Sequence, residues 1–501
     1  MVHLKGIKKK DTTGAFTQTG LHEIDLSFRN QEFVAILGPA GSGKTTLLNM
    51  IGGLDSYDSG ELIIDGKSTK QFTDCEWAAY RHHSIGFIFQ RDQLIPHLNL
   101  LDNVKMGVTF SDLTATEKKK KALGTLEKVG LKGHAKKKPT QLSSEQMQRA
   151  AIARALVNEP DIILAHEPTD VFDATVNDQL MTLIKELAED KLVMITTAHP
   201  ELATRYADRI VVFKEGSMIS DSNPYTGNGV DNDEDFKPTA MSHLTALKLS
   251  GKKLATKKWR TALTAFVSSI GMIGVALMMS LSNGIQSYLA HFQSEAHAGI
   301  PLVRMQDASL LDEDMKKRVQ ETLIVFPNGF EPPENLMAHL DDFNDNMVEA
   351  NSHRIVYLDQ ATLMMTTASG LLSAITFVLM VFITTSFVVS LMLIAMTMHL
   401  SVMERTEEIG ILNVLGARRR DMMRVFHAET MLMGMCSGIL AIIMSYLLTF
   451  PANRLFYQQT TLRNMIVFHP LHALFLLLFS LTSTRLGGLI PIRLAAKRGK
   501  W

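Results

Sequence analysis

The sequence has little cysteine and no excess of charge of either sign. Only two cysteines, Cys75 and Cys436, occur among 501 residues, and they lie far apart in different kinds of sequence. No disulfide framework is expected, which fits a reducing compartment for most of the chain. Lysine plus arginine and aspartate plus glutamate each number 51. Net charge therefore indicates neither an acidic nor a basic partner, and we expect no nucleic-acid partner.

The amino-terminal end also lacks a long apolar run. Its first residues, MVHLKGIKKK, contain neither an apolar core nor a small-residue cleavage site, so we expect no signal peptide. A chain of 501 residues is too long for one compact core, so several domains are expected.

Residues 1–225 have the pattern of a soluble α/β domain. Short apolar runs typical of strands alternate with helical patterns such as TTLLNMIGGL and MQRAAIARALVN. The apolar runs are FVAILG, SIGFIF, DIILA, LVMITT and RIVVF. This alternation predicts a mainly parallel sheet flanked by helices.

Residues 226–260 are predicted to hold a linker and a helix. The stretch SDSNPYTGNGVDNDEDFKP is rich in turn-forming residues and marks the linker. The following stretch, MSHLTALKLSGKKLATKKW, combines apolar residues at helical spacing with a cluster of lysines. It suits a helix in the membrane interface, and an ordinary amphipathic surface helix is the alternative.

The carboxy-terminal half contains four apolar segments of about 20 residues, the length that a bilayer core requires. They predict an all-α domain with four membrane spans. Basic residues gather before the first span, between the second and third, and after the fourth, whereas acidic residues dominate between the first and second. The positive-inside rule then places both termini in the cytoplasm. The predicted spans are 261–281, 368–400, 428–450 and a fourth within 469–501, which also includes a cytoplasmic tail. A small extracytoplasmic domain at 282–367 and a short loop at 451–468 are predicted to lie outside. The loop at 401–427 is predicted to lie in the cytoplasm.

Residues 38–45, GPAGSGKT, match the phosphate-binding pattern G-x-x-x-x-G-K-T/S. They follow the apolar run EFVAIL and open a helical pattern, which is the context that this loop requires. Backbone N–H groups and the helix N-terminus would surround phosphates. Lys44 would bridge the β- and γ-phosphates of ATP, and the Thr45 hydroxyl would hold Mg²⁺. The candidate nucleotide-binding residues of this loop are Gly38, Pro39, Ala40, Gly41, Ser42, Gly43, Lys44, Thr45 and Thr46.

Further motifs follow in a fixed order. GPAGSGKTT, FIFQ, QLSSEQMQRAAIARAL, IILAHEPTD and TTAHPELA together resemble an ABC-transporter ATPase domain. SVMERTEEIGILNVLGARRRDMMRVFHAET and GGLIPIRLAAKR resemble the cytoplasmic loop and the end of an FtsX-like permease. The combination is similar to MacB-like exporters, in which ATPase and permease are fused, and it covers nearly the whole chain except about 290–365.

The resemblance implies roles for individual residues. Gln90 would sense Mg²⁺ as a ligand and contact the permease, and Glu167 would orient the attacking water as general base. Ser143 and Gln146 would belong to the signature that clamps ATP bound to the opposite subunit. Asp173 would lie at the interface of a homodimer. The loop at 401–427 would contain a coupling helix that docks on the ATPase domain.

Four positions depart from the family pattern. His166 stands where the family has an aspartate that binds Mg²⁺ through water, and Mg²⁺ prefers hard oxygen ligands. Ser144 and Glu145 lie in a signature where two glycines are usual, and Glu145 is expected to repel phosphate. Ala198 occupies the position of the switch histidine, which leaves His199, one residue later, as the catalytic candidate.

Two functions remain open from these residues. In the first, an ABC-type ATPase couples hydrolysis of ATP to export or extraction of a peptide, an antibiotic or a lipid-anchored molecule at a bacterial cytoplasmic membrane. In the second, the protein binds ATP without useful hydrolysis and acts as a membrane scaffold or sensor. A soluble NTPase with a simple anchor is a third, less favoured interpretation. The implied partners are a second copy of the chain, the lipid bilayer, and an extracytoplasmic adaptor or substrate peptide.

Overall fold

The computed structural model describes residues 2–13, 16–90, 94–169, 173–225, 240–256, 258–297, 360–403, 406–460 and 466–498. Most of the predicted extracytoplasmic domain, 282–367, therefore lies outside the described residues. The chain divides into two compact units. The first unit comprises Met1–Ala262, Ile394–Met433 and Thr484–Trp501, and the second comprises Leu263–Leu393 and Gly434–Ser483.

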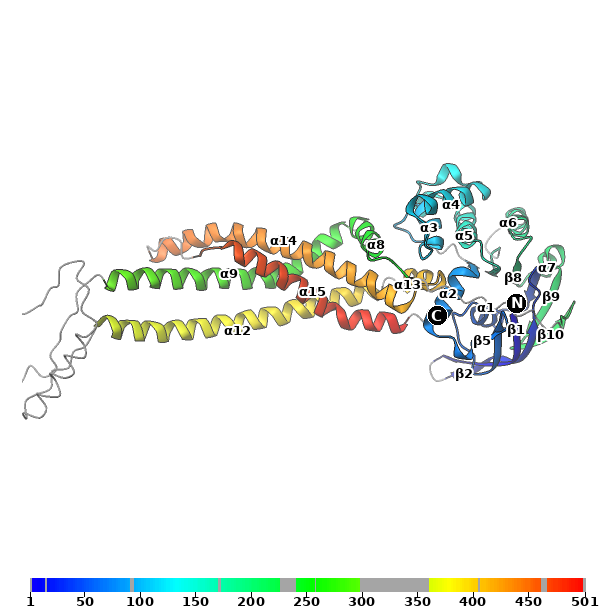
Figure 1. The fold of residues 1–501 in the computed structure, drawn as a ribbon, viewed down its shortest axis with the longest axis horizontal. Coiled ribbons are helices and arrows are strands. Elements are labelled where there is room, and N and C mark those ends of the chain that lie inside the picture. Colours follow the sequence, from blue (N-terminus) through cyan, green and yellow to red (C-terminus); the bar gives the residue numbers. More distant parts are fainter. Residues whose placement is uncertain are drawn as a thin grey trace, which may run out of the picture. The chain divides into compact units, whose positions relative to one another are not determined.

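A six-stranded sheet forms the centre of the ATPase-like part of the first unit (Figure 1). Its order is β10 (Ser217–Asp221), β9 (Arg209–Lys214), β3 (Glu32–Leu37), β8 (Leu192–Thr197), β7 (Ile162–His166) and β6 (Ile85–Ile88). All neighbouring pairs are parallel except β9 and β10, which form an antiparallel hairpin. This confirms the predicted α/β fold with a mainly parallel sheet.

The sheet is buried on both faces. Along β3, Val34 and Ile36 belong to one apolar cluster, whereas Phe33 and Ala35 belong to another. Because successive side chains of a strand point to opposite faces, the two clusters are cores on the two sides of the sheet. The covering helices are α1 (Lys44–Ile51), α2 (Asp74–His83), α3 (Leu100–Lys105), α4 (Ala115–Lys128), α5 (Ser144–Leu156), α6 (Ala174–Leu187) and α7 (Pro200–Tyr206). Four short 3₁₀ turns are η1 (Thr69–Gln71), η2 (Met106–Val108), η3 (Lys132–His134) and η4 (Pro139–Gln141).

A second, antiparallel sheet was not predicted. Its order is β2 (Phe16–Ser27), β1 (Val2–Thr13), β4 (Ser59–Ile64) and β5 (Lys67–Ser68). Val2, Leu4 and Ile7 of β1 are buried, but the register with both neighbours shifts between Leu4 and Lys8. These bulges and the lysines that follow hide the alternation of apolar and polar residues that identifies a strand in sequence.

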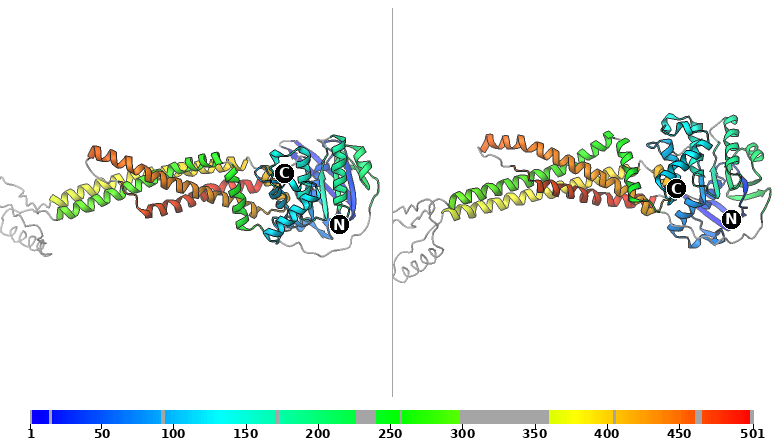
Figure 2. Two further views of the ribbon diagram at one scale, coloured as in Figure 1. Left: turned by 90° about the horizontal axis from the view of Figure 1, so that it is seen from above. Right: turned by 45° about the horizontal axis from the view of Figure 1, so that its top comes forward.

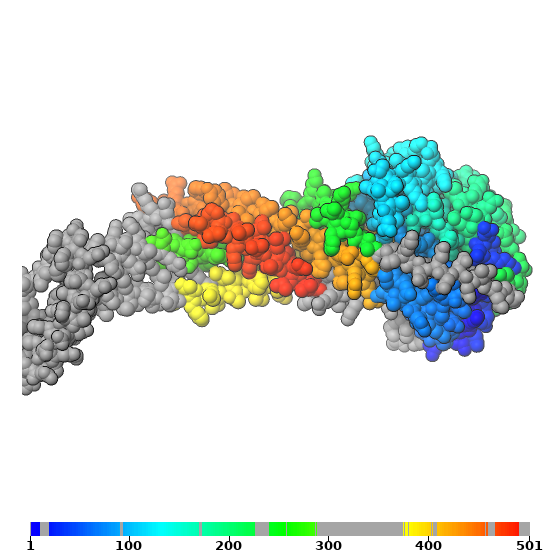
Figure 3. Space-filling model, in the orientation of Figure 1, coloured from blue at the N-terminus to red at the C-terminus, as the bar shows by residue number. Residues whose placement is uncertain are grey.

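Helical segments that follow the two sheets in the sequence also belong to the first unit, and three of them pack together. They are α8 (His243–Thr256), α13 (Thr406–Val414) and the start of α14 (Arg419–Thr460). A shared apolar cluster joins them to residues near α3, and Ser250 of α8 donates a hydrogen bond of 3.0 Å to the carbonyl of Val425. The space-filling view shows α8, in green, against the start of α14 (Figure 3).

The described part of the second unit is helical. It contains most of α9 (Lys258–His297) and α12 (Gln360–Met403), the later part of α14, and the start of α15 (Pro470–Arg498). Stretches of these helices are long and apolar enough to cross a membrane: Lys258–Ile285, Thr376–Ser401, Arg419–Leu455 and Pro470–Leu489. The four predicted apolar segments are thus confirmed as helices, and α9, α12 and α14 continue beyond the spans expected from the sequence.

Small residues bring these helices close together. Ser386 donates a hydrogen bond of 3.2 Å to the Gly271 carbonyl, and a side chain at Gly271 would meet Ser390 at 2.8 Å. α9 and α12 run side by side in three views (Figures 1 and 2). Ser437 and Ser480 are 3.1 Å apart, oxygen to oxygen, and join α14 to α15. Packing through small and hydroxyl residues is typical of helices in a bilayer.

Candidate nucleotide-binding site and its link to the helices

The ends of the parallel strands bring the expected site residues to one edge of the sheet. The phosphate-binding loop follows β3, His166 ends β7, and Gln90 comes two residues after β6. The register places Thr196 of β8 beside both Ile36 and His166. Ligands of open α/β sheets bind outside these carboxyl ends, so the fold supports a nucleotide site there.

The loop depends on glycine at two points. Gly41 has a φ of +78° and Gly43 a φ of +95°, a left-handed conformation that side chains rarely adopt. A side chain at Gly43 would also come within 2.6 Å of the Gly20 carbonyl oxygen. Gly43 directly precedes α1, so the loop turns sharply and delivers its backbone N–H groups to the start of the helix.

Lys44 is held over this loop. Its side chain is 4% exposed, and its ammonium donates hydrogen bonds to the carbonyls of Gly38, at 2.7 Å, and Pro39, at 2.8 Å. The same Nζ atom is 3.7 Å from Oε1 of Glu167. The structure thus brings together the lysine and the carboxylate that the sequence analysis assigns to phosphate binding and to general base chemistry.

Glu167 takes an unusual backbone conformation, with a φ of +41°. Its backbone N–H lies 3.1 Å from the Thr196 carbonyl and 3.2 Å from the Thr196 hydroxyl, and both accept from it. A non-glycine residue in this region is strained, and such strain often marks functional sites. Here the turn at the end of β7 directs the carboxylate towards Lys44.

His166 lies between two threonines. Its Nε2 atom is 3.3 Å from Oγ1 of Thr45, and its Nδ1 atom is 3.1 Å from Oγ1 of Thr196. The Thr45 hydroxyl is an oxygen that fits Mg²⁺, whereas the imidazole offers nitrogen and, when neutral, no negative charge. The residues present therefore fit the expected Mg²⁺ at Thr45 but not at His166.

The altered signature lies at the start of α5. Ser143 caps the helix, with its hydroxyl accepting from the Gln146 N–H and its own N–H donating to the Gln146 side chain, both at 3.2 Å. Glu145 forms an ion pair of 2.7 Å with Arg149, one turn along the helix. Arg149 therefore offsets part of the negative charge that Glu145 brings to the signature.

The other expected residues lie at different places around this edge. Asp173 caps α6 by accepting from the Val176 N–H at 3.1 Å, and its surface is exposed. His199 caps the start of α7, and its imidazole is 3.4 Å from the Glu201 carboxylate. The structure describes Gln90 as half-buried and places it directly after Phe89.

Sequence reasoning missed one polar residue next to this segment. Gln148 of α5 is 1% exposed and donates a hydrogen bond of 3.1 Å to the carbonyl of Phe89. It ties the signature helix to the segment that carries Gln90. A second glutamine two residues after Gln146 was the available signal.

The segment around α13 contacts the ATPase-like part through Arg81 of α2. The Arg81 Nε atom donates to the Asn413 carbonyl at 2.8 Å, and one terminal nitrogen donates to the Gly53 carbonyl at 2.7 Å. Burial lowers the pKa of Arg81 to about 10, and Asp74 partly offsets this, so the guanidinium stays charged at neutral pH. The buried cation thus binds carbonyls of both segments at once.

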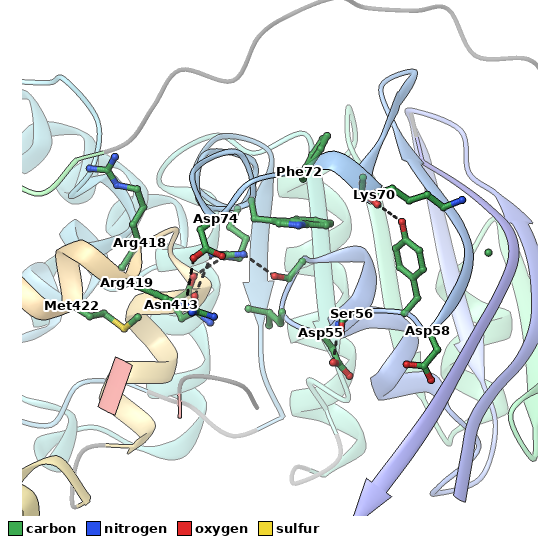
Figure 4. Close-up of a pocket in the computed structure, with 18 of the residues that line it drawn as sticks. Asp55, Ser56, Asp58, Lys70, Phe72, Asp74, Asn413, Arg418, Arg419 and Met422 are labelled. Atoms are coloured by element: carbon green, nitrogen blue, oxygen red, sulfur yellow. Dashed lines mark hydrogen bonds and ion pairs between the residues drawn. The ribbon is translucent and has the colours of Figure 1, made fainter. Parts of the chain in front are cut away.

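Backbone contact closes the same interface. Gly416 has a φ of +90°, and a side chain there would lie 2.5 Å from the Ala78 carbonyl oxygen and 2.7 Å from His82. Beside this contact lies a cavity of about 730 Å³. Arg418 and Arg419 line one side of it, and Asp55, Asp58 and Lys70 line the other (Figure 4).

A buried carboxylate fixes the start of α14. Asp421 is 0% exposed and accepts from Arg418, at 3.1 Å, from Arg424, at 3.2 Å, and from the Met241 N–H, at 3.1 Å. The Met241 N–H comes from the segment before α8. Arg418 of this basic loop thus has a partner within the protein.

The lysines of α8 also have protein partners. Lys253 forms a largely buried ion pair of 3.0 Å with Glu429 of α14, and Lys252 pairs with Asp102 at 2.6 Å. These contacts join α8 to α14 and α3 through two of the lysines that suggested a helix in the membrane interface.

Comparison with known proteins agrees with this arrangement. A family model for ABC transporters matches residues 21–170, and one for the FtsX-like permease C-terminal region matches residues 380–500. An uncharacterized ABC transporter ATP-binding protein of Bacillus subtilis is 41% identical over 224 residues, which are 44% of this chain and 97% of that protein. The chain belongs to the ABC transporter family.

Relatives that carry a permease match a longer part of this ABC transporter. A probable syringafactin export ATP-binding/permease protein of Pseudomonas syringae is 33% identical over 58% of this chain and 46% of its own length. A macrolide export ATP-binding/permease protein of Aeromonas hydrophila is 32% identical over 57% and 45%. The chain thus spans about half the length of these two curated relatives. A solved dimeric ATP-binding cassette bound to ADP and phosphate is 39% identical, covers 46% of this chain and 100% of that chain, and has a TM-score of 0.42.

The matches establish an ABC-type ATPase domain followed by an FtsX-like permease domain with apolar helices suited to an inner membrane.

Proposed function

We propose that this ABC transporter couples ATP binding and hydrolysis to the export or extraction of a substrate at the cytoplasmic membrane. The observation that carries the proposal is the distance of 3.7 Å between Lys44 and Glu167, which lie in the same unit as the buried contact between Arg81 and Asn413. In the proposal, Lys44 binds the phosphates and Glu167 orients the attacking water. The contact between Arg81 and Asn413 would transmit movement of the ATPase domain to the helices.

The site residues have separate roles in this proposal. The loop from Gly38 to Thr46 binds the phosphates, and Lys44 neutralises charge that develops during phosphoryl transfer. Glu167 orients the water, and its turned backbone keeps the carboxylate near the phosphates. Gln90 couples the nucleotide to the permease, and His199 remains the candidate for the switch position.

We further propose a homodimer. In this arrangement Ser143, Gln146 and Asp173 of one copy complete the nucleotide site of the other. Their capping roles within their own helices support this, because the caps hold the start of α5 and the start of α6 in fixed positions. Two copies would also supply eight spans, since the described residues of each chain contain four candidate spans.

The domain limits and the orientation belong to the same proposal. Residues 1–225 form the nucleotide-binding domain, 226–260 the linker and α8, and 401–427 the coupling loop, with both termini in the cytoplasm. The outside segment, 282–367, would meet a substrate or an adaptor. Peptides, antibiotics and lipid-anchored molecules are the candidate substrates, and two relatives have syringafactin export and macrolide export in their names.

One observation favours a second function, an ATP-binding scaffold with little hydrolysis. His166 supplies nitrogen where a metal-binding carboxylate is usual, and Ser144 occupies a position in α5 where a glycine is usual. Both copies of a homodimer would carry the same changes. In that case the binding of ATP, and not its hydrolysis, would control the conformation of the protein.

The deciding experiment measures ATP hydrolysis by the full-length protein in lipid nanodiscs, with Glu167→Gln as the matched variant. The carboxamide keeps the size of the side chain but cannot accept a proton, so we expect turnover to disappear while ATP binding remains. Equal turnover in both proteins, with ATP bound, would reject the exporter and support the scaffold.

A further inference from the structure

We propose that the nucleotide site takes a first-row transition metal, represented by Mn²⁺, in preference to Mg²⁺, with His166 as a direct ligand. The inference rests on the proposed binding of ATP at this loop. It concerns which cation binds together with the nucleotide, and it gives His166 the role of selecting that cation.

The position of the imidazole is the first observation. Nδ1 of His166 is 3.1 Å from the Thr196 hydroxyl, which fixes the plane of the ring from behind. Nε2 then points to the Thr45 hydroxyl at 3.3 Å, beside the phosphate-binding loop. One nitrogen is thus held by the protein and the other faces the side chain that is expected to hold the metal.

This pattern is typical of metal-binding histidines. Such histidines almost always use their second nitrogen for a hydrogen bond that sets the orientation of the ring. Thr196 is well placed for this because it pairs with His166 across β7 and β8, is 0% exposed, and also accepts from the Glu167 N–H. The ring is therefore oriented by a buried residue of the central sheet.

The chemistry of the donor set decides between cations. Thr45 and the ATP phosphates offer oxygen, and His166 offers an imidazole nitrogen. Mg²⁺ demands oxygen ligands in near-ideal octahedral geometry. First-row transition-metal ions bind imidazole as well as oxygen, and Mn²⁺ is the member of that series that shares the preference of Mg²⁺ for oxygen ligands. Replacing a carboxylate by a neutral ring removes one negative charge, which weakens the hold on any cation that cannot gain a bond to nitrogen.

A simpler role for His166 makes a different prediction. If the ring only accepted a hydrogen bond from a metal-bound water, the site would show no preference for Mn²⁺. A metal–nitrogen bond, in contrast, leaves a direct spectroscopic mark, because the unpaired electrons of Mn²⁺ couple to the ¹⁴N nucleus of a bound imidazole.

The test uses the full-length protein in nanodiscs with a non-hydrolysable ATP analogue. Pulsed electron paramagnetic resonance of the Mn²⁺–nucleotide complex should show ¹⁴N coupling in the wild type, and the coupling should vanish in His166→Asp. His166→Asn is the matched control, since it stays neutral but removes the imidazole. We expect analogue affinity to be about 10-fold higher with Mn²⁺ than with Mg²⁺ in the wild type, a difference of about 1.4 kcal/mol, and nearly equal in His166→Asp.

The outcomes separate the inference from the proposed function. Analogue binding without ¹⁴N coupling, or with equal affinities for both cations, overturns the inference and leaves ATP binding intact. Failure to bind the analogue with either cation, in the wild type and in His166→Asp alike, overturns the proposed function itself. A sample with Mn²⁺ but without nucleotide identifies signals from cations on surface carboxylates.

Discussion

The nucleotide site and the interface formed by α2, α13 and the start of α14 belong to the same unit but are built differently. At the nucleotide site, the key side chains lie at the ends of strands and at the start of α1, and Glu167 is 18% exposed. At the interface, His82 is 2% exposed and Asp421 is fully buried. A side chain at a strand end can find partners on neighbouring elements, as His166 does with two threonines. A buried charge or a close backbone contact has no such freedom.

The difference teaches where this ABC transporter departs from its family. His166 ends β7, Ser144 begins α5 and Ala198 follows β8, so all three lie near the carboxyl edge of the central sheet. The contacts between the ATPase-like part and the α13 segment involve other residues, among them Arg81 and Asn413.

The largest expected effect comes from the interface. Asp421→Ala would leave Arg418, Arg424 and the Met241 N–H without their shared acceptor. Removing one partner of a buried ion pair costs about 3 kcal/mol. Hydrogen exchange should show that protection of residues 240–256 falls by more than about 100-fold. Asp421→Asn keeps an acceptor oxygen, so it should lose less of this protection than Asp421→Ala. Equal losses of protection in the two variants would contradict a role for the charge.

A slightly smaller effect is expected at the nucleotide site. Lys44→Ala removes the buried ammonium that contacts the loop carbonyls and faces Glu167. Hydrogen bonds to charged groups contribute about 1.5 kcal/mol or more each, so losing two phosphate contacts should weaken ATP binding by about 100-fold. Titration with a fluorescent ATP analogue measures this, with the exposed Lys119→Ala as control. Unchanged affinity in Lys44→Ala would place the nucleotide elsewhere.

Gly416→Ala tests the close backbone contact. The new methyl group would meet the Ala78 carbonyl, and the left-handed backbone adds strain of about 1–2 kcal/mol. We expect faster hydrogen exchange in α2 and α13 and weaker coupling of ATP turnover to substrate. Gly133→Ala is the matched control, because a side chain there has open space. Equal rates of hydrogen exchange in the two variants would show that the contact does not stabilise α2 and α13.

The smallest expected effect is a dependence of stability on pH. Burial, with help from the neighbouring His83, lowers the pKa of His82 to about 4. The unfolded state, with a pKa near 6.5, takes up the proton first as the pH falls, so stability present above pH 6.5 is lost towards pH 4. The loss should reach about 1 kcal/mol by pH 5.5. His82→Phe should flatten this part of a denaturation profile, and an unchanged slope would exclude His82 as its source.

Much of the site was predictable because its geometry is local. The phosphate-binding loop needs glycine at positions with positive φ, so Gly41 and Gly43 appear in a recognisable pattern. The pairing of Glu145 with Arg149 was also predictable, since residues four apart share a helix face. It was overlooked because the signature was compared with its family pattern alone.

Contacts between distant residues were not predictable. His166 was identified as unusual, but Thr45 and Thr196 lie 121 and 30 residues away from it. Arg81 and Asn413 are 332 residues apart, and only the folded chain shows that they meet. The spacing of residues along the sequence does not indicate which distant residues come into contact.

The most direct test of the account compares Mg-ATP hydrolysis by the wild type and by His166→Asp in nanodiscs, each with Glu167→Gln as its blank. If His166 is what weakens the use of Mg²⁺ at an otherwise intact ATPase site, the aspartate should raise turnover by about 10-fold, equivalent to about 1.4 kcal/mol in the barrier. Turnover that stays the same or falls in His166→Asp would contradict the account.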